Sequence, residues 1–333
     1  MIDFSQIKKI IEKNNSFVIT THVNPDADAL GSELAFYYIL KRMNKKVHII
    51  NNNSTPYNLE FLDKDSVIKK YDKENHDAII NNVDVVLFLD LNHINRTVRM
   101  EETIRNSGKI FVCIDHHQHP ENFSEFMFIN DLYSSTGEII FDFIKETKIT
   151  KLDYEIAVPI YAAIMTDTGS FRFERTTPEL HRKTAELLET GVNPKEVFSQ
   201  IYDNGNLGKL KLLGEALVSL STNSTGEVGY IIITQEILKK TGADETDVDG
   251  FVNYCLATKD SKIGILFFEL KNGLKISFRS KTKIPVNELA AEYGGGGHFH
   301  AAGVRLFNVN LKEYVDKVVN DAEKFIKKYQ AKK

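Results

Sequence analysis

The first half of the chain alternates short apolar runs with segments in which apolar residues recur at helical spacing. The run VDVVLFLDLN at 83–92 is almost continuously hydrophobic, which is typical of a strand at the centre of a parallel sheet. The predicted strands cover 16–22, 46–52, 83–92 and 109–117, and the predicted helices between them cover 29–44 and 96–108. This alternation predicts an α/β fold built on a doubly wound, mostly parallel sheet.

The second half of the chain begins with helical patterns and then changes to strands. Helices are expected at 153–169, 176–191, 193–204, 209–220, 248–258 and 314–329, and strands at 227–234, 262–270 and 273–280. The sequence KNG between the last two strands predicts a hairpin turn. We therefore expect a first domain over 1–192, a helical linker over 193–222, and a second, smaller α/β domain with antiparallel pairing over 223–333.

Composition excludes several classes of protein. A chain of 333 residues that is 42% hydrophobic and 26% charged has the composition of a soluble globular protein. Its net charge of −4 argues against a binder of long nucleic acid, which is normally basic, but it allows a small phosphorylated substrate. No apolar run reaches membrane-spanning length, and only two cysteines occur, Cys113 and Cys255. These features predict a cytoplasmic protein without a membrane partner.

The stretch THVNPDADALGS at 21–32 gathers His22, Asp26 and Asp28 where the first predicted strand ends. In an open α/β sheet, ligands bind at the carboxyl ends of the strands. The three side chains could therefore converge on one ligand. A simpler interpretation is also open, in which these residues only form a turn and Asp28 caps a helix that starts at the next residue.

Other polar residues occupy equivalent places. Asp90 ends the apolar run of the strand at 83–92, and Asp115, His116 and His117 end the strand at 109–117. Asp167 follows the apolar part of a predicted helix that could reach the same edge. Asp90 or Asp167 alone could be a helix cap, but together these residues indicate a site.

So many carboxylates in one cleft would repel one another unless cations were present. Aspartate and histidine without thiolate form a hard oxygen and imidazole ligand set, which suits Mn²⁺ and, less exclusively, Mg²⁺, Fe²⁺ or Co²⁺. Six or seven ligands are too many for one catalytic ion that keeps open positions. We therefore expect two divalent ions, about 3.5–4 Å apart, that share one carboxylate.

These same residues resemble a known family. HVNPDADALGS, LDLN, DHH and DTGSF resemble the four motifs of the DHH phosphoesterases in order and spacing, and GGGGHFHAAG at 294–303 resembles the signature of the DHHA1 domain. The resemblance covers nearly the whole chain. In length and layout the chain is most similar to the stand-alone bacterial nanoRNase and pAp phosphatase subfamily.

The resemblance implies a role for each site residue. One ion would be held by His22, Asp26 and Asp90, and the other by Asp28, Asp90, His116 and Asp167, with Asp90 as the bridge. His117 would face the phosphate as a donor or general acid, and Asp115 would orient the histidines. Arg96 is a candidate phosphate clamp, although it could equally be a surface arginine on a helix.

The glycine run at 294–297 predicts a second anion-binding element. Its N–H groups, including those of Gly295, Gly296 and Gly297, could form an anion nest beside His298, with Arg279 as a partner. A flexible loop is the alternative. Between residues 251 and 310 there are eight Lys or Arg against four Asp or Glu, so we expect the second domain to grip the far end of the substrate.

The resemblance implies hydrolysis of very short RNA, of about two to five nucleotides, to mononucleotides, and of 3′-phosphoadenosine 5′-phosphate (pAp) to AMP. Hydrolysis of cyclic di-AMP or of the linear dinucleotides pApA and pGpG is an alternative. A pyrophosphatase would lack the glycine run, and a long-strand exonuclease would need further domains. A non-catalytic nucleotide-binding regulator is less favoured because no metal ligand is missing. By resemblance, a homodimer is possible.

Overall fold

The computed structural model describes residues 2–281 and 283–330. It divides into two compact units, Met1–Asn204 and Gly205–Lys333. The division falls inside the segment that the sequence predicted as a linker. Of that segment, α8 (Pro194–Tyr202) lies in the first unit, while α9 (Leu207–Ser219) and β7 (Ser221–Thr222) lie in the second.

The first unit is a six-stranded sheet in which every neighbouring pair is parallel, in the order β3-β2-β1-β4-β5-β6. The strands are β1 (Ser16–Thr20), β2 (Lys46–Asn51), β3 (Ile68–Lys70), β4 (Val85–Leu89), β5 (Ile110–Asp115) and β6 (Phe126–Ile129). The predicted doubly wound sheet is therefore confirmed. The strand order reverses between β1 and β4, and ligands of such sheets bind outside the carboxyl ends of the strands at this point.

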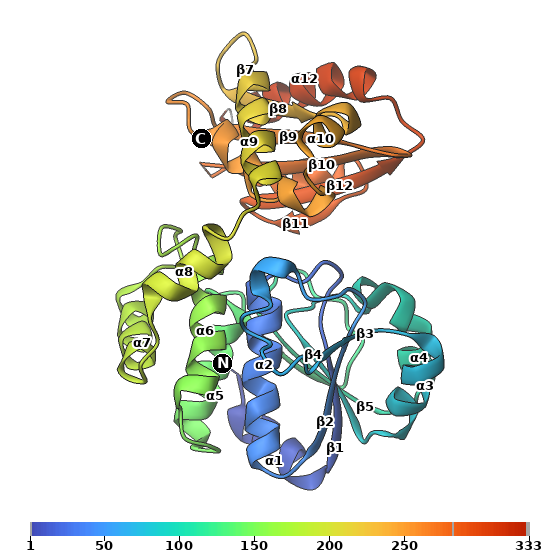
Figure 1. Cartoon of the computed structure of the whole chain (residues 1–333), viewed down its shortest axis with the longest axis vertical. Helices are drawn as coiled ribbons and strands as arrows, with labels where there is room; N and C mark the ends of the chain where they lie inside the picture. The colour runs from blue at the N-terminus through green and yellow to red at the C-terminus, as the bar shows by residue number, and fades with distance from the viewer. Residues whose placement is uncertain (1, 282, 331–333) are drawn as a thin grey trace. The chain divides into compact units, whose positions relative to one another are not determined.

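Helices cover both faces of this sheet (Figure 1). On one face lie α1 (Phe4–Lys13), α2 (Ala27–Arg42), α5 (Thr136–Thr147) and α6 (Tyr154–Asp167), and on the other α3 (Lys73–Asn82) and α4 (Glu101–Asn106). The remaining helical segments are η1 (Tyr57–Leu59), η2 (Ile94–Met100) and α7 (Pro178–Glu189). Successive residues of β1 alternate between the two cores: Phe17 and Ile19 pack in one and Val18 in the other.

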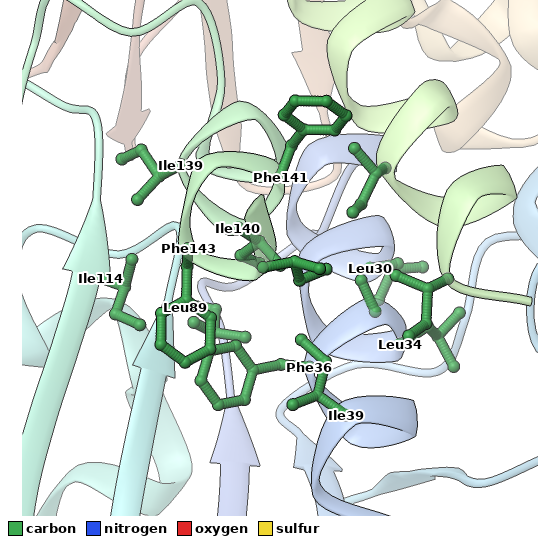
Figure 2. Close-up of a cluster of buried hydrophobic side chains, with 14 of the residues drawn as sticks. Leu30, Leu34, Phe36, Ile39, Leu89, Ile114, Ile139, Ile140, Phe141 and Phe143 are labelled. Atoms are coloured by element: carbon green, nitrogen blue, oxygen red, sulfur yellow. The ribbon is translucent and has the colours of Figure 1, made fainter. Parts of the chain in front are cut away.

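Figure 2 shows the larger core, where side chains of α2 and α5 meet Leu89 and Ile114 from the ends of β4 and β5. The rings of Phe36 and Phe143 stack with centroids 5.7 Å apart. Glycines let the helices approach closely: a Cβ on Gly31 would lie 2.4 Å from the carbonyl oxygen of Pro159. This close packing brings the start of α2 and the end of α6 to the same edge of the sheet.

The second unit is a mixed sheet in the order β11-β12-β10-β9-β8-β7. Its strands, besides β7, are β8 (Val228–Ile233), β9 (Ile263–Leu270), β10 (Gly273–Ser280), β11 (Gly296–His298) and β12 (Ala301–Phe307). The hairpin between β9 and β10 is confirmed. Pairing is antiparallel as expected, with one difference: β8 and β9 are parallel, because a long helical crossover connects them.

Helices cover both faces of the second sheet as well. One core holds α11 (Val286–Ala291) and α12 (Leu311–Gln330), and the other holds α9, α10 (Gln235–Thr241), η3 (Glu245–Val248) and η4 (Phe251–Leu256). Among the described residues, no helix combines the length and apolar character needed to span a bilayer. Cys113 and Cys255 are buried free thiols.

Two predicted helices differ in the structure. The helix predicted over 248–258 is the short 3-10 segment η4, which lies so close to the sheet that a Cβ on Gly229 would be 2.3 Å from the carbonyl oxygen of Cys255. The helix predicted over 96–108 is divided into η2 and α4. Val98 interrupts η2 with a φ of 52°, so the backbone kinks before α4 begins.

Candidate metal centre

The structure brings six of the predicted residues to the carboxyl edge of the first sheet. His22 follows β1, Asp90 follows β4, and His116 follows β5. Asp26 and Asp28 lie at the start of α2, and Asp167 is the last residue of α6. β1 and β4 flank the point where the strand order reverses, and β5 pairs with β4, so the fold gathers the side chains at this edge.

The first turn of α2 separates the roles of its two aspartates. Asp26 is the N-cap, and its Oδ1 accepts hydrogen bonds from the backbone N–H groups of Asp28 and Ala29, both at 3.1 Å. The interpretation in which Asp28 caps the helix is therefore wrong. Asp28 is helical instead, and its side chain points to other partners.

The carboxylate of Asp28 is fully buried and accepts hydrogen bonds from the start of α5. The backbone N–H of Thr136 donates to Oδ2 at 2.8 Å, and that of Gly137 donates to Oδ1 at 2.9 Å. Ser32 Oγ adds a third contact at 3.2 Å. A helix N-terminus favours an anion because its first N–H groups lack intrahelical acceptors. These contacts fix the orientation of Asp28.

Asp90 lies at the centre of the cluster, and its two oxygens face different neighbours. Oδ2 lies 3.3 Å from Nε2 of His22. Oδ1 lies 3.5 Å from Nε2 of His116, 3.4 Å from Nδ1 of His117, and 3.2 Å from Oγ1 of Thr136. The φ of Asp90 is 56°, a left-handed conformation that costs a non-glycine residue free energy and is often found at functional sites.

Three overlapping groups of side chains could each hold a metal ion. They are His22 with Asp26 and Asp90; Asp28 with His116 and Asp167; and Asp90 with His116 and His117. Within each group the potential ligand atoms lie within 4.8 Å of one another. The Nδ1 of His22 is 3.0 Å from the carbonyl oxygen of Val23, which leaves Nε2 directed at Asp90. Such an outer contact is typical of a metal-binding histidine.

The electrostatics of the cluster fit divalent cations. Burial raises the pKa of Asp28 well above its usual value, and the charges of Asp90 and Asp167 raise it further. Burial also raises the pKa of Asp167, to about 6. Burial lowers the pKa of His116, but hydrogen bonds to Asp167 and Asp90 outweigh it and raise the pKa well above the usual value. The carboxylates thus compete for positive charge, which a divalent ion would supply.

His117, which belongs to the third of these groups of possible metal ligands, is also paired with Asp115. Oδ1 of the buried Asp115 lies 2.7 Å from Nδ1 of His117. A carboxylate at this distance sets the orientation of the imidazole ring.

The structure places Arg96 beside the loop that carries His22. Its backbone carbonyl accepts a hydrogen bond from Val23 N–H at 2.9 Å, and its Nη1 donates to Asn92 Oδ1 at 3.4 Å. Arg96 belongs to η2 rather than to a regular surface helix. Burial lowers the pKa of His22, but the hydrogen bond to Asp90 outweighs it and the pKa is raised overall; the charge of Arg96 opposes this rise, so the two side chains are close enough to interact electrostatically.

The glycine run of the second unit is not the predicted loop. Gly294 and Gly295 end α11 with backbone hydrogen bonds to Ala291 and Ala290, whereas Gly296 and Gly297 belong to β11. Successive N–H groups of a strand point in opposite directions, so this part cannot form a nest of consecutive donors. Close packing explains two of the glycines, since a Cβ on Gly295 would lie 2.3 Å from the carbonyl oxygen of Gly303 and one on Gly297 would lie 2.5 Å from that of Ala301.

Arg279 and His298 are both register partners of Ala301 in β12, one from β10 and the other from β11. Arg279 lies on the face of β10 opposite the buried Phe278, and its Nη1 donates to the carbonyl oxygen of Phe278 at 3.0 Å. The side chain of His298 lies outside the described part of the structure.

Sequence reasoning missed Thr136 as a site residue. The sequence SSTGE at 134–138 has the pattern of a capping box, and Ser135 Oγ accepts from the N–H of Glu138 at 3.0 Å. In a capping box the glutamate side chain would accept from the N–H of the N-cap residue, Ser135. Here Glu138 Oε2 accepts instead from the N–H of Ser134, at 2.8 Å. The capping pattern locates the start of α5, but no local signal shows that this start contacts Asp28 and Asp90 across more than 40 residues of sequence.

The chain is similar to known proteins over both of its units. Residues 16–164 match the model of the DHH family N-terminal domain, and residues 228–328 match that of the DHHA1 domain. The chain is 29% identical to the bifunctional oligoribonuclease and PAP phosphatase NrnA of Thermus thermophilus over 95% of this chain and 91% of that protein. Identity to the Bacillus subtilis protein of the same name is 25%, over 98% and 99% of the two chains.

Among solved structures, an exopolyphosphatase-related protein from Bacteroides fragilis superimposes with a TM-score of 0.90 and 31% identity, over 98% of this chain and 96% of that one. The similarity therefore extends over both units and includes the segments that carry the Asp and His cluster. The chain belongs to the DHH phosphoesterase family, with a DHHA1 domain as its second part.

Proposed function

We propose that this protein is a metal-dependent phosphoesterase that hydrolyses very short RNA to mononucleotides and pAp to AMP. The observation that carries the proposal is the arrangement around Asp90, whose two oxygens face two different groups of Asp and His side chains. The names of the relatives from Thermus thermophilus and Bacillus subtilis support the substrate class, since the similarity covers nearly their full length.

We assign two divalent cations to the cluster. His22, Asp26 and Asp90 would hold one ion, and Asp28, Asp90, His116 and Asp167 would hold the other. Mn²⁺ is the preferred ion, with Mg²⁺, Co²⁺ or Fe²⁺ as substitutes, because the ligands are carboxylate oxygens and imidazole nitrogens. When bound, such ions activate water for in-line attack on phosphorus and neutralise charge on the phosphoryl oxygens.

The remaining residues of the site would act on the substrate. We assign His117 as hydrogen-bond donor or general acid at the phosphate, because its Nδ1 is already paired with Asp115. Asp115 is then a positioning residue that holds the ring. Arg96 would bind a phosphate oxygen, since a guanidinium matches phosphate geometry with two parallel donors.

We assign the second unit to the other end of the substrate. Arg279 lies on the same face of β10 as Lys275, and together they provide positive charge on that face. Gly295, Gly296, Gly297 and His298 remain candidates for substrate contact through β11, which is an edge strand of the described sheet. Its outward N–H groups, rather than a nest, would then donate to the substrate.

Free thiols in a buried environment also fit a reducing compartment, so we place the protein in the cytoplasm.

The test is a substrate panel with metal-stripped protein and added Mn²⁺. We expect turnover of a labelled RNA dinucleotide, a 5-mer and pAp, and little turnover of a 24-mer or pyrophosphate. Cyclic di-AMP and pApA report on the alternative phosphodiesterase activity. Full turnover after exhaustive chelation, with no metal found by elemental analysis, would overturn the dinuclear assignment.

A further inference from the structure

Aromatic side chains lie exposed on the part of the first unit that carries Asp26 and Asp167. Phe198 and Tyr202 are on α8, and they are 39% and 45% exposed. Phe173, six residues after Asp167, is 52% exposed. Isolated exposed aromatics need no explanation, but a group of them beside a ligand site suggests contact with the ligand.

Phe198 and Tyr202, which we call the α8 aromatic pair, form one continuous surface. They are four residues apart on the helix, so they lie on the same face. Their ring centroids are 4.8 Å apart and their planes are tilted by 51°. The pair thus offers an apolar surface large enough to contact a planar group.

The segment 53–58 connects the end of α8 to the loop before α2. Asn58 Nδ2 donates a hydrogen bond to the carbonyl oxygen of Ile201, the second-last residue of α8, at 3.1 Å. Five residues before Asn58, Asn53 Oδ1 accepts a hydrogen bond at 3.0 Å from the N–H of Asn24, in the loop between β1 and α2. Asn24 is two residues from Asp26, so this contact connects the α8 end to one side of the metal centre.

The other side of Tyr202 faces the end of α6. Its hydroxyl lies near Ser170, three residues after Asp167. Burial raises the pKa of this hydroxyl, and the charges of Asp167 and Asp26 add to that effect, as expected for a side chain near both carboxylates. Tyr202 therefore lies on the side of the first unit that carries these two carboxylates.

Arg172 completes this surface. Its Nε donates to the carbonyl oxygen of Gly169 at 2.6 Å, and its guanidinium lies 5.8 Å from the ring centroid of Phe173. The charge of Arg172 also tends to lower the pKa of Tyr202. Aromatic rings and guanidinium planes are the groups on which proteins stack unpaired nucleobases.

We propose that the α8 aromatic pair stacks on the nucleobase of the nucleotide whose phosphate lies at the metal centre. This inference rests on the proposed function, because it takes the substrate to be a nucleotide. Every base has a π-face, so stacking holds the substrate without reading its sequence. The site would then accept any short RNA, with purines bound more tightly than pyrimidines because of their larger ring area.

The test compares an RNA dinucleotide with the same molecule made abasic. In Phe198→Leu and Tyr202→Leu, the ratio of kcat/KM for the dinucleotide to kcat/KM for the abasic compound should fall about fivefold to a hundredfold, the usual effect of losing one stacked base. Tyr202→Trp should restore most of the ratio. Tyr154→Leu is the matched control, because Tyr154 is 44% exposed at the opposite end of α6 from Asp167.

An unchanged ratio in both leucine variants, or an equal fall in Tyr154→Leu, would overturn the stacking proposal. A second measurement separates this from failure of the proposed function. The fluorescence of 2-aminopurine riboside 5′-monophosphate should be quenched on binding to wild-type protein and less so by Tyr202→Leu. If wild type hydrolyses neither the dinucleotide nor pAp, the proposed function is wrong, and the quenching alone then decides whether the pair stacks a base.

Discussion

The hydroxyl of Thr136 tests how the metal ligands are held in place. It is buried at the start of α5 and donates to Asp90 Oδ1 at 3.2 Å, while the backbone N–H of the same residue donates to Asp28. Thr136→Val keeps the side-chain shape and the backbone contact, but it removes the hydroxyl. Asp90 then loses the donor that helps fix its carboxylate between the two groups of ligands.

The expected effect follows from the charge of the acceptor. A hydrogen bond to a charged group contributes about 1.5–3 kcal/mol, which corresponds to about a tenfold to hundredfold change in an equilibrium constant. Loss of an outer partner of a metal ligand lowers metal affinity by a similar factor. We therefore expect the Kd for Mn²⁺ to rise about tenfold to a hundredfold in Thr136→Val.

Isothermal titration of Mn²⁺ into metal-stripped protein measures this change. Thr184→Val is the matched control, because Thr184 is also buried but its hydroxyl donates within α7, to the carbonyl oxygen of Leu180 at 2.8 Å. The control should bind Mn²⁺ like wild type, and Thr136→Ser should retain most of the affinity. A wild-type Kd in Thr136→Val would refute the argument that this hydroxyl positions Asp90.

Three further predictions concern other parts of the site. Asp90→Ala should abolish turnover and lower the bound metal, measured by elemental analysis, far more than Asp115→Ala; equal metal content in the two variants would contradict the bridging role of Asp90. The pKa of Asp167 in the folded, metal-free protein is raised to about 6. Between about pH 4 and 6 the folded protein therefore keeps a proton on Asp167 that the unfolded chain releases. The contribution of Asp167 to the free energy of unfolding should thus fall as pH rises through this window. Because Asp167 must be ionised to bind a metal, the affinity for Mn²⁺ should rise over the same window by up to about tenfold per pH unit. Calorimetry in two buffers should detect the release of the proton. A pH-independent affinity would contradict the assignment of Asp167 as a ligand. Arg279→Ala should raise KM about tenfold to a hundredfold for substrates with a second phosphate, whereas Lys275→Ala, on the same face of β10 but paired with Asp249 at 3.2 Å, should have a smaller effect. Equal effects of the two substitutions in steady-state kinetics would show that the response reflects general positive charge.

The sequence alone determined where the site residues lie along the chain. The apolar runs before His22, Asp90 and Asp115 mark buried parallel strands, and parallel strands direct their carboxyl ends to one edge of a sheet. That local pattern is sufficient to predict that these polar residues meet. The types of side chain are sufficient to predict which kind of metal ion they would bind.

Local sequence patterns predicted secondary structure less well where contacts between distant segments outweigh the intrinsic preference of the residues for helix, strand or loop. The glycine run at 294–297 is compatible with a loop, and only pairing with β12 turns Gly296 and Gly297 into a strand. The segment 248–258 has helical spacing, but its close approach to β8 and β9 selects a tight 3-10 turn. In both cases the deciding atoms belong to residues that are distant in sequence.

Only the tertiary structure decided how the cluster is arranged. The two oxygens of Asp90 face different neighbours, and Thr136 contacts both Asp28 and Asp90. Both features depend on the close packing of α2 and α5 on α6. A Cβ on Gly137 would lie 2.5 Å from Cβ of Ala163, which is too close for two carbon atoms, so this packing depends on the absence of a side chain at that position. Periodicity and propensity act along the chain and cannot report such distances, because hydrogen bonds to a buried carboxylate form only when separate elements have docked.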